Sequence, residues 1–281
     1  MQARVTIENL SFHYQPGKPV FEHLDFSVAS REVLCLLGPN GTGKSTLIKC
    51  LAGLLRAQGG SVLLDGKPLT GLKPAAIARM IGYVPQGQPS VFPFLVQDVV
   101  VMGRAAHLNA ISSPSQADYA IAREAMAAVG ISHIAHSHCN AISSGEWQLV
   151  LIARALTQSP KILLLDEPTS HLDMGKQMRI LKVIMDLAAS GLTIVMASHF
   201  PDHALLASQR VAILKDRRFI AMGDPETVIT PDNLHAAYSI EVKILRIDGD
   251  VDRAICVPMV GSASVKQGPE RHPSGEKIPR E

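Results

Sequence analysis

The chain has 281 residues, of which 47% are hydrophobic, and a formal net charge of +2 from 27 basic and 25 acidic residues. This near balance excludes the basic field that non-specific nucleic-acid binding requires, and the hydrophobic fraction is sufficient for a sizeable core. The apolar runs are too short to cross a bilayer, and the N-terminus lacks an apolar signal core, so we expect a cytosolic chain. The scattered cysteines form no C-x-x-C pair, which indicates a reducing compartment.

The first thirty residues predict a small antiparallel sheet. The segments RVTIENLSFHY and FEHLDFSV are expected to be strands joined by the turn-rich QPGKP. Behind them, short runs rich in Val, Ile and Leu recur with helical patterns between most of them, which is typical of a wound, mostly parallel α/β sheet. These runs lie at 33–37, 162–165, 193–197 and 211–214. We therefore predict an α/β fold with two β layers.

Between about residues 87 and 160 no comparable strand pattern occurs, and we predict an inserted helical subdomain. The segment SPSQADYAIAREAMAAVG is a well-delimited helix, with Pro114 near its start and Gly130 just past its end. A later helix, GKQMRILKVIMDLAASG, is expected to end at Gly191.

The C-terminal residues differ in composition from the rest. From about Gly261 the sequence is polar and rich in Gly, Pro and charge, which predicts a solvated, disordered tail over 261–281. The folded domain is accordingly assigned to residues 1–260.

A phosphate-binding pattern follows the apolar run at 33–37. The run VLCLL leads into GPNGTGKST and then into the helical LIKCLAGLL, so the G-x-x-x-x-G-K-[ST] pattern lies between a strand and a helix, as its mechanism requires. Chance produces the bare pattern in on the order of one chain in a hundred of this length, so an incidental glycine-rich turn is disfavoured. The predicted nucleotide-binding residues here are Gly38, Pro39, Asn40, Gly41, Thr42, Gly43, Lys44, Ser45 and Thr46.

The chemistry of this loop assigns roles to three side chains. Backbone N–H groups and the positive end of the following helix would cradle phosphates. Lys44 would reach the β and γ oxygens, Ser45 would hold magnesium, and Thr46 would donate to the α-phosphate.

Two adjacent carboxylates end the buried run ILLLDEP. Asp166 is placed to orient magnesium, directly or through water, and Glu167 to polarise the attacking water as a general base. A strand-end turn with solvent-facing acids is the alternative, which the upstream phosphate-binding loop disfavours.

With these motifs the chain resembles the ATP-binding subunit of an ABC transporter over roughly residues 5–247. Gln86 in IGYVPQ matches the Q-loop glutamine, SSGEWQ stands where the signature LSGGQ belongs, and SHLD matches the D-loop. His199 matches the switch histidine, and Tyr14 matches the aromatic residue on which adenine stacks. Taken singly, each has an ordinary structural explanation, and only the ordered set favours the functional one.

The resemblance implies that two subunits close head to tail, so that each ATP lies between one subunit's phosphate loop and the other's signature loop. His199 would contact the γ-phosphate, Gln86 would link magnesium and water to the membrane partner, and Asp173 would connect the two sites. Ser143 and Gly145 match the signature residues that meet the γ-phosphate. The implied catalytic residues are Lys44, Gln86, Glu167 and His199, and the implied magnesium ligands are Ser45, Gln86 and Asp166.

The segments VVVMGRAAHL, TSHLDMGKQ and PDHAL resemble the ATPases of importers that take up metal chelates, namely ferric siderophores, haem or cobalamin. A molybdate or tungstate importer is a close variant. The implied partners are integral membrane permease subunits, a second copy of the chain and a periplasmic or surface substrate-binding protein, with the ATPase peripheral on the cytoplasmic face of the inner membrane. Two alternatives are a soluble ABC-type ATPase acting on DNA or ribosomes and a nucleotide-binding module with little turnover.

Three residues depart from the family pattern. Ser144 replaces the first signature glycine, Trp147 stands where Arg is frequent, and Phe200 follows the switch histidine where Asp is common. If Ser144 must adopt a left-handed conformation, the strain is roughly 1 to 2 kcal/mol. Loss of an anion-facing donor would cost roughly 3 to 4 kcal/mol in the transition state. We therefore expect an altered rate, not a lost activity.

Two further groups of side chains have open interpretations. Phe92 and Phe94 either line a groove for a coupling helix of the membrane subunit or belong to the core of the helical subdomain. The cluster SHIAHSHC is either a solvated loop, which we favour, or a zinc or copper site. Its candidate ligands are His133, His136, His138 and Cys139.

Overall fold

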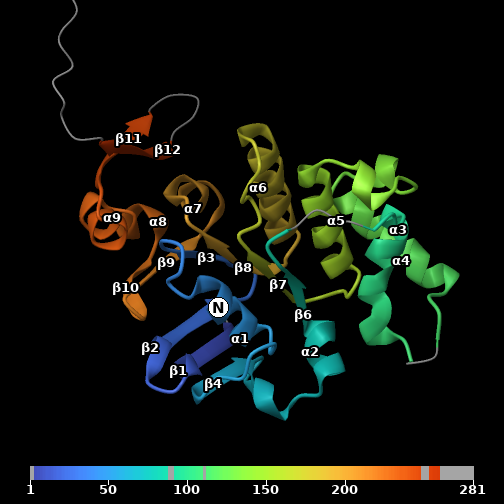
Figure 1. The fold of residues 1–281 in the computed structure, drawn as a ribbon, viewed down its shortest axis with the longest axis horizontal. Coiled ribbons are helices and arrows are strands. Elements are labelled where there is room, and N and C mark those ends of the chain that lie inside the picture. The colour runs from blue at the N-terminus through green and yellow to red at the C-terminus, as the bar shows by residue number, and fades with distance from the viewer. Residues whose placement is uncertain (1–2, 88–91, 110–111, 248–252, 260–281) are drawn as a thin grey trace, which may run out of the picture.

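A six-stranded sheet forms the centre of the computed structural model, which describes residues 3–87, 92–109, 112–247 and 253–259 (Figure 1). Its strand order is β10-β9-β3-β8-β7-β6, and all neighbours are parallel except the antiparallel pair β9–β10. The strands are β3 (Val33–Leu37), β6 (Ile81–Val84), β7 (Ile162–Asp166), β8 (Thr193–Ser198), β9 (Arg210–Lys215) and β10 (Arg218–Gly223). The predicted mostly parallel sheet is confirmed, and two of its strands, β6 and β10, were missed because neither is a continuous apolar run.

The second sheet is antiparallel and has the order β2-β1-β4-β5. Its strands are β1 (Ala3–Gln15), β2 (Lys18–Ala29), β4 (Gly59–Leu64) and β5 (Lys67–Pro68). The predicted N-terminal hairpin is confirmed. The chain returns to this sheet through β4 after the phosphate-binding loop, and that return is not among the predicted elements.

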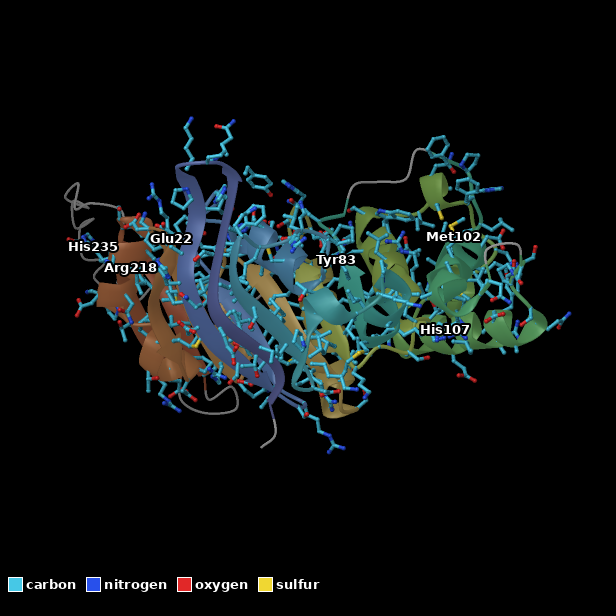
Figure 2. All side chains as sticks on the ribbon, turned by 90° about the horizontal axis from the view of Figure 1, so that it is seen from below. Glu22, Tyr83, Met102, His107, Arg218 and His235 are labelled. Atoms are coloured by element: carbon cyan, nitrogen blue, oxygen red, sulfur yellow. The ribbon has the colours of Figure 1, made fainter. Side chains whose placement is uncertain are left out.

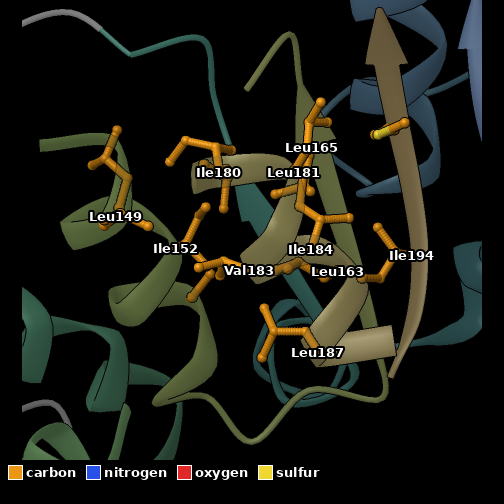
Figure 3. Close-up of a cluster of buried hydrophobic side chains, with 14 of the residues drawn as sticks. Leu149, Ile152, Leu163, Leu165, Ile180, Leu181, Val183, Ile184, Leu187 and Ile194 are labelled. Atoms are coloured by element: carbon orange, nitrogen blue, oxygen red, sulfur yellow. The ribbon is translucent and has the colours of Figure 1, made fainter. Parts of the chain in front are cut away.

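Alternate residues of β3 face two separate hydrophobic cores. Val33, Cys35 and Leu37 belong to the core that contains α5 and α6, whereas Leu34 and Leu36 belong to the core that contains α1 and the antiparallel sheet. Successive strand side chains point to opposite faces, so the central sheet is covered on both sides. Figure 3 shows the first core, where α6 packs its apolar side over β7 and β8. This packing fixes the ends of the central strands.

The helical region predicted between residues 87 and 160 contains α3 (Val96–Val101), α4 (Gln116–Ala128) and α5 (Ser144–Leu156). Its described residues contain no strand and a single isolated bridge, between Leu95 and His138. The predicted helix α4 is confirmed, with Ser115 as its N-cap and Gly130 in a left-handed conformation past its end. Figure 2 shows this region, which carries Met102 and His107, at the opposite end of the molecule from His235.

The remaining helices flank the sheets. They are α1 (Lys44–Leu51), α2 (Pro74–Met80), α6 (Met174–Ala189), α7 (Pro201–Ala207), α8 (Pro225–Val228) and α9 (Pro231–Tyr238), with 3-10 turns at Leu69–Gly71, Met102–His107, Ser132–Ile134 and Cys139–Ala141. None of the helices in the described part of the chain has both the length and the apolar composition that a membrane span requires.

A C-terminal hairpin, β11 (Glu241–Ile247) with β12 (Arg253–Met259), packs against α7. The backbone N–H of Cys256 on β12 donates a 2.8 Å hydrogen bond to Asp202 on α7. These residues lie within the predicted domain, but the hairpin itself is not among the predicted elements. The tail predicted over 261–281 lies outside the described residues, and the domain boundaries stay predictions.

Candidate active site

Four segments of the predicted site follow the carboxyl ends of neighbouring parallel strands. The loop 38–46 follows β3, and His199 follows β8. Asp166 ends β7 with Glu167 directly after it, and Gln86 comes shortly after β6. Because these strands are adjacent and parallel, their carboxyl ends lie along one edge of the sheet. In open α/β sheets this edge is where ligands bind.

Two glycines allow the loop 38–46 to lie close against neighbouring backbone and side chains. Gly38 has φ 154°, and a Cβ there would lie 2.5 Å from the carbonyl oxygen of Leu214 on β9. Gly43 has φ 103°, and a Cβ there would lie 2.6 Å from Val20 on β2. Only glycine fits both positions, and the loop leads directly into the N-terminus of α1, a geometry that suits an anion.

Lys44 is buried in the centre of this loop. Its Nζ donates to the carbonyl oxygens of Gly38 and Pro39, both at 2.8 Å, and lies 3.6 Å from Oε1 of Glu167. Burial lowers the pKa of Lys44, and the Glu167 carboxylate opposes that shift. A phosphate group bound in the loop would place further negative charge beside the Lys44 ammonium group.

Ser45 and Asp166 meet at the expected magnesium position. Ser45 Oγ donates a 2.7 Å hydrogen bond to Asp166 Oδ1, which joins α1 to the end of β7. Burial raises the pKa of Asp166, and the hydrogen bond from Ser45 opposes the shift. A hydroxyl and a carboxylate side by side are the oxygen ligands that magnesium prefers, so the residues fit this ion. The third predicted ligand, Gln86, is exposed, and its Nε2 approaches His171 Nε2 at 3.5 Å.

Glu167 lies between Lys44 and His199. Its Oε2 accepts a 2.8 Å hydrogen bond from Ser170 Oγ and lies 3.3 Å from His199 Nδ1. Its backbone has φ 48°, a left-handed conformation that is uncommon for a residue other than glycine. Strain of this kind is concentrated at functional sites, where the surrounding structure enforces it.

The imidazole of His199 packs on the adjacent aromatic ring. Its ring centroid lies 4.0 Å from that of Phe200, which in turn lies 4.8 Å from His203. His199 Nδ1 is buried without a hydrogen bond, although Glu167 is within 3.3 Å, so the two groups are close but not aligned. Phe200, a departure from the family pattern, thus packs between two histidines.

The signature segment forms the N-terminus of α5. Ser143 is the N-cap, and Ser144 is the first helical residue. Ser144 is not among the residues with positive φ, so the left-handed strain considered above does not arise. A Cβ on Gly145 would lie 2.8 Å from the side chain of Lys176 on α6, which explains why a glycine fits here.

Within the described ranges, no hydrogen bond or ion pair joins this segment to the loop 38–46. Ser143 and Gly145 instead line a pocket of about 130 Å³ with Lys176 and Arg179 of α6. Asp173 caps α6, accepting from Lys176 N at 2.9 Å and pairing with Lys176 Nζ at 2.9 Å. The predicted site residues therefore form two groups in one chain. The first surrounds the loop 38–46, and the second comprises Ser143, Gly145 and Asp173 at the N-termini of α5 and α6.

Tyr14 belongs to the first group. Its side chain is 61% exposed, and its hydroxyl lies 3.2 Å from Thr46 Oγ1 at the start of α1. The edge of its ring contacts Phe12, with centroids 4.9 Å apart. An exposed aromatic face beside the loop is suited to stack on a planar base.

The structure also bears on the two interpretations left open above, those of Phe92 and Phe94 and of the SHIAHSHC cluster. Phe92 and Phe94 are 62% and 51% exposed, so their interpretation as core is wrong. In the described part of the chain no three His, Cys, Asp or Glu side chains are arranged to hold a metal ion. Cys139 is buried, whereas His138 bonds to the carbonyl oxygen of Pro93, so the zinc or copper alternative has no support.

Three residues near the site were not predicted. Ser170 and His171 stand in the SHLD segment and contact Glu167 and Gln86. Tyr238, at the end of α9, donates to the carbonyl oxygen of His199 at 3.1 Å. The D-loop motif contained a signal for the first two, but a tyrosine 39 residues beyond the histidine carried none.

Residues 21–170 match the family model described as ABC transporter, and this match covers more than half of the chain. The chain belongs to the ABC transporter ATP-binding family. Residues 140–201, which include the signature, carboxylate and switch segments, also match an AAA domain model. ABC ATP-binding proteins bind ATP and are ATPases coupled to transport, so the predicted enzyme class is confirmed.

Similar proteins agree with this assignment. An uncharacterised ABC transporter ATP-binding protein of Haemophilus influenzae is 39% identical, over 85% of this chain and 90% of its own. A hemin import ATP-binding protein of Nocardia farcinica is 40% identical, over 82% of this chain and 79% of its own. The solved structure of a metal-chelate type ABC transporter in an inward-facing conformation has a TM-score of 0.82 and 32% identity, over 92% of this ABC ATPase and 98% of that chain.

Proposed function

We propose that this ABC ATPase drives the import of a metal chelate, an iron–siderophore complex, haem or cobalamin, through separate integral membrane permease subunits. The observation that carries the catalytic part is the convergence of Lys44, Asp166 and Glu167 at one sheet edge. The cargo class is supported by the similarity to the hemin import protein and to the metal-chelate type transporter.

A molybdate or tungstate importer is the second candidate for the cargo. It is supported by 34% identity to a molybdate import ATP-binding protein of Haemophilus influenzae, over 85% of this chain and 90% of that protein. In either case we place the chain peripherally on the cytoplasmic face of the inner membrane, with a periplasmic or surface substrate-binding protein in the complex.

In the proposed mechanism, adenine stacks on Tyr14 and the phosphates lie in the loop 38–46. Lys44 turns from the loop carbonyls to the β and γ oxygens. Magnesium held by Ser45, Gln86 and Asp166 would stabilise the negative charge that develops on the phosphates.

Hydrolysis needs a base and a contact to the γ-phosphate. Glu167 accepts a proton from water as the water oxygen bonds to the γ-phosphorus, while the bond to the β–γ bridging oxygen breaks and ADP leaves. His199 contacts the γ-phosphate, and its position beside Glu167 keeps both groups on the same side of the reacting phosphorus.

The separation of Ser143 and Gly145 from the loop 38–46 supports a head-to-tail homodimer. In such a dimer these residues would face the γ-phosphate bound by the second copy, and Asp173 would lie between the two sites. The exposed Phe92 and Phe94 are suited to contact the permease.

Reconstitution tests the proposal. The chain is purified with its permease subunits, placed in proteoliposomes with the substrate-binding protein, and supplied with hemin, cobalamin, a ferric siderophore or molybdate in parallel. We expect ATP-dependent uptake of one chelate, and none with a Glu167→Gln chain. Uptake of molybdate alone would select the second candidate. Copurification with nucleic acid and not with membrane would favour the soluble alternative, and tight ATP binding without phosphate release would favour the low-turnover module.

A further inference from the structure

The Tyr238 hydroxyl contacts the loop that follows β8. It donates a 3.1 Å hydrogen bond to the carbonyl oxygen of His199. Tyr238 ends α9, so this bond joins two segments that are 39 residues apart in the chain.

The surroundings of Tyr238 hold this oxygen in place. Its ring packs against the hydrophobic core beneath the sheet, and the residue ends α9, where Ser239 takes a left-handed conformation. Burial raises the pKa of the tyrosine hydroxyl, which therefore remains a neutral donor at physiological pH. The hydrogen bond to His199 is accordingly independent of pH in the range where the enzyme works.

His199 has few other restraints. Its Nδ1 makes no hydrogen bond, its ring packs on Phe200, and the Glu167 carboxylate lies 3.3 Å from Nδ1. A fixed backbone carbonyl therefore contributes to the position of the imidazole. The chain after Tyr238 forms the hairpin β11–β12, and Cys256 on this hairpin bonds to Asp202, three residues beyond His199. The C-terminal region thus contacts the segment from His199 to Asp202 at two points.

We propose that Tyr238 is a positioning residue that holds His199 where it can contact a γ-phosphate. The inference rests on the proposed role of His199 at that phosphate. Tyr238 touches neither substrate nor reacting atoms and acts through His199. Binding of ATP should therefore depend on Tyr238 more than binding of ADP does, because ADP lacks the γ-phosphate.

The test compares Tyr238→Phe with Tyr119→Phe in the full chain. Both variants keep the ring and lose one hydroxyl, and Tyr119 on α4 donates to Asp98 at 3.2 Å, in the helical subdomain. Affinities are measured for Mg-ADP and for a non-hydrolysable ATP analogue, the β,γ-imido triphosphate. The ATPase rate of each variant is measured in complex with the permease subunits, and thermal unfolding is followed in parallel.

We expect Tyr238→Phe to weaken analogue binding and lower kcat by about three- to tenfold each, the effect of one neutral hydrogen bond, with ADP affinity unchanged. Tyr119→Phe should leave all three values at those of the wild type. The inference is overturned if Tyr238→Phe weakens ADP and analogue binding equally, which indicates a merely structural role, or if it changes neither. The ratio of analogue affinity to ADP affinity is measured without cargo, so an error in the proposed cargo would not change this result.

Discussion

Ser143 and Glu146 hydrogen-bond to each other in both directions at the start of α5. Ser143 Oγ donates to Glu146 Oε2 at 2.7 Å and accepts from Glu146 N at 3.3 Å, while Ser143 N donates to the same carboxylate at 2.8 Å. These contacts hold the pKa of Glu146 below its ordinary value, so the carboxylate stays ionised. The serine proposed to meet the γ-phosphate is therefore also a helix cap, and its proton must turn away from Glu146 to reach an anion.

The double role of Ser143 predicts two separable losses in Ser143→Ala. Loss of the cap should lower the free energy of unfolding by about 1 kcal/mol. Loss of a donor to a charged phosphate should lower the ATPase rate at saturating ATP by about ten- to a hundredfold. Chemical denaturation and phosphate release with the permease subunits measure the two effects.

The matched control for this variant is Ser115→Ala. Ser115 forms the same reciprocal cap with Asp118 at the start of α4. Its replacement should cost similar stability and leave ATP hydrolysis unchanged. An equal fall in ATPase for both variants would show that Ser143 acts only as a cap.

Ser144→Gly should leave the ATPase rate unchanged or raise it slightly. Ser144 is exposed and helical, so glycine relieves no strain and removes no observed contact. The free energy of unfolding should fall by less than about 0.5 kcal/mol, because glycine is the poorer helix former. Ser144→Ala, which removes the hydroxyl without adding backbone freedom, should behave alike. A sharp loss of turnover in both variants would instead identify the serine hydroxyl as a ligand.

Glu167→Gln should lower phosphate release by about a hundred- to ten-thousandfold, the usual contribution of a general base. ATP binding should persist, because the loop 38–46 and Lys44 are untouched. Single-turnover hydrolysis and equilibrium ATP binding separate the two effects. Glu124→Gln, on the exposed side of α4, serves as the control. Undiminished magnesium-dependent hydrolysis in Glu167→Gln would refute the proposed mechanism.

Asp118 should make stability depend on pH in the acid range. Hydrogen bonds from Ser115 and from Arg104 Nε, the latter 2.8 Å long, hold the pKa of Asp118 below its ordinary value of 3.8. A lowered pKa in the folded state adds stability that is full well above pH 3.8 and is lost as the pH falls through the folded-state value. Thermal unfolding of Asp118→Asn should therefore differ most from the wild type at neutral pH, and the difference should shrink below about pH 4.

Asp186→Asn is the control for the acid range. Asp186 pairs with Lys182 at 3.0 Å, but both side chains are largely exposed, at 59% and 72%. Such a pair contributes little. A difference for Asp118→Asn that stays constant from pH 7 to pH 3 would exclude the linkage.

The sequence by itself determined the local parts of the site. The glycine spacing of the loop 38–46, the two carboxylates after the apolar run at 162–165 and the capped helix α4 each depend on backbone geometry within a few residues. Such short-range preferences can be recognised without knowledge of distant contacts. The resemblance to a family added the order of the motifs, and with it the expectation of a site shared between two copies of the chain.

Only the tertiary structure decided the contacts between segments far apart in the chain. Tyr238 reaches His199, and Ser144 is helical and unstrained, because both faces of the central sheet are packed and this packing fixes where each loop ends. The exposure of Phe94 likewise depends on which helices cover which face. Residue type and spacing do not encode these outcomes, since many long-range arrangements satisfy the same local pattern.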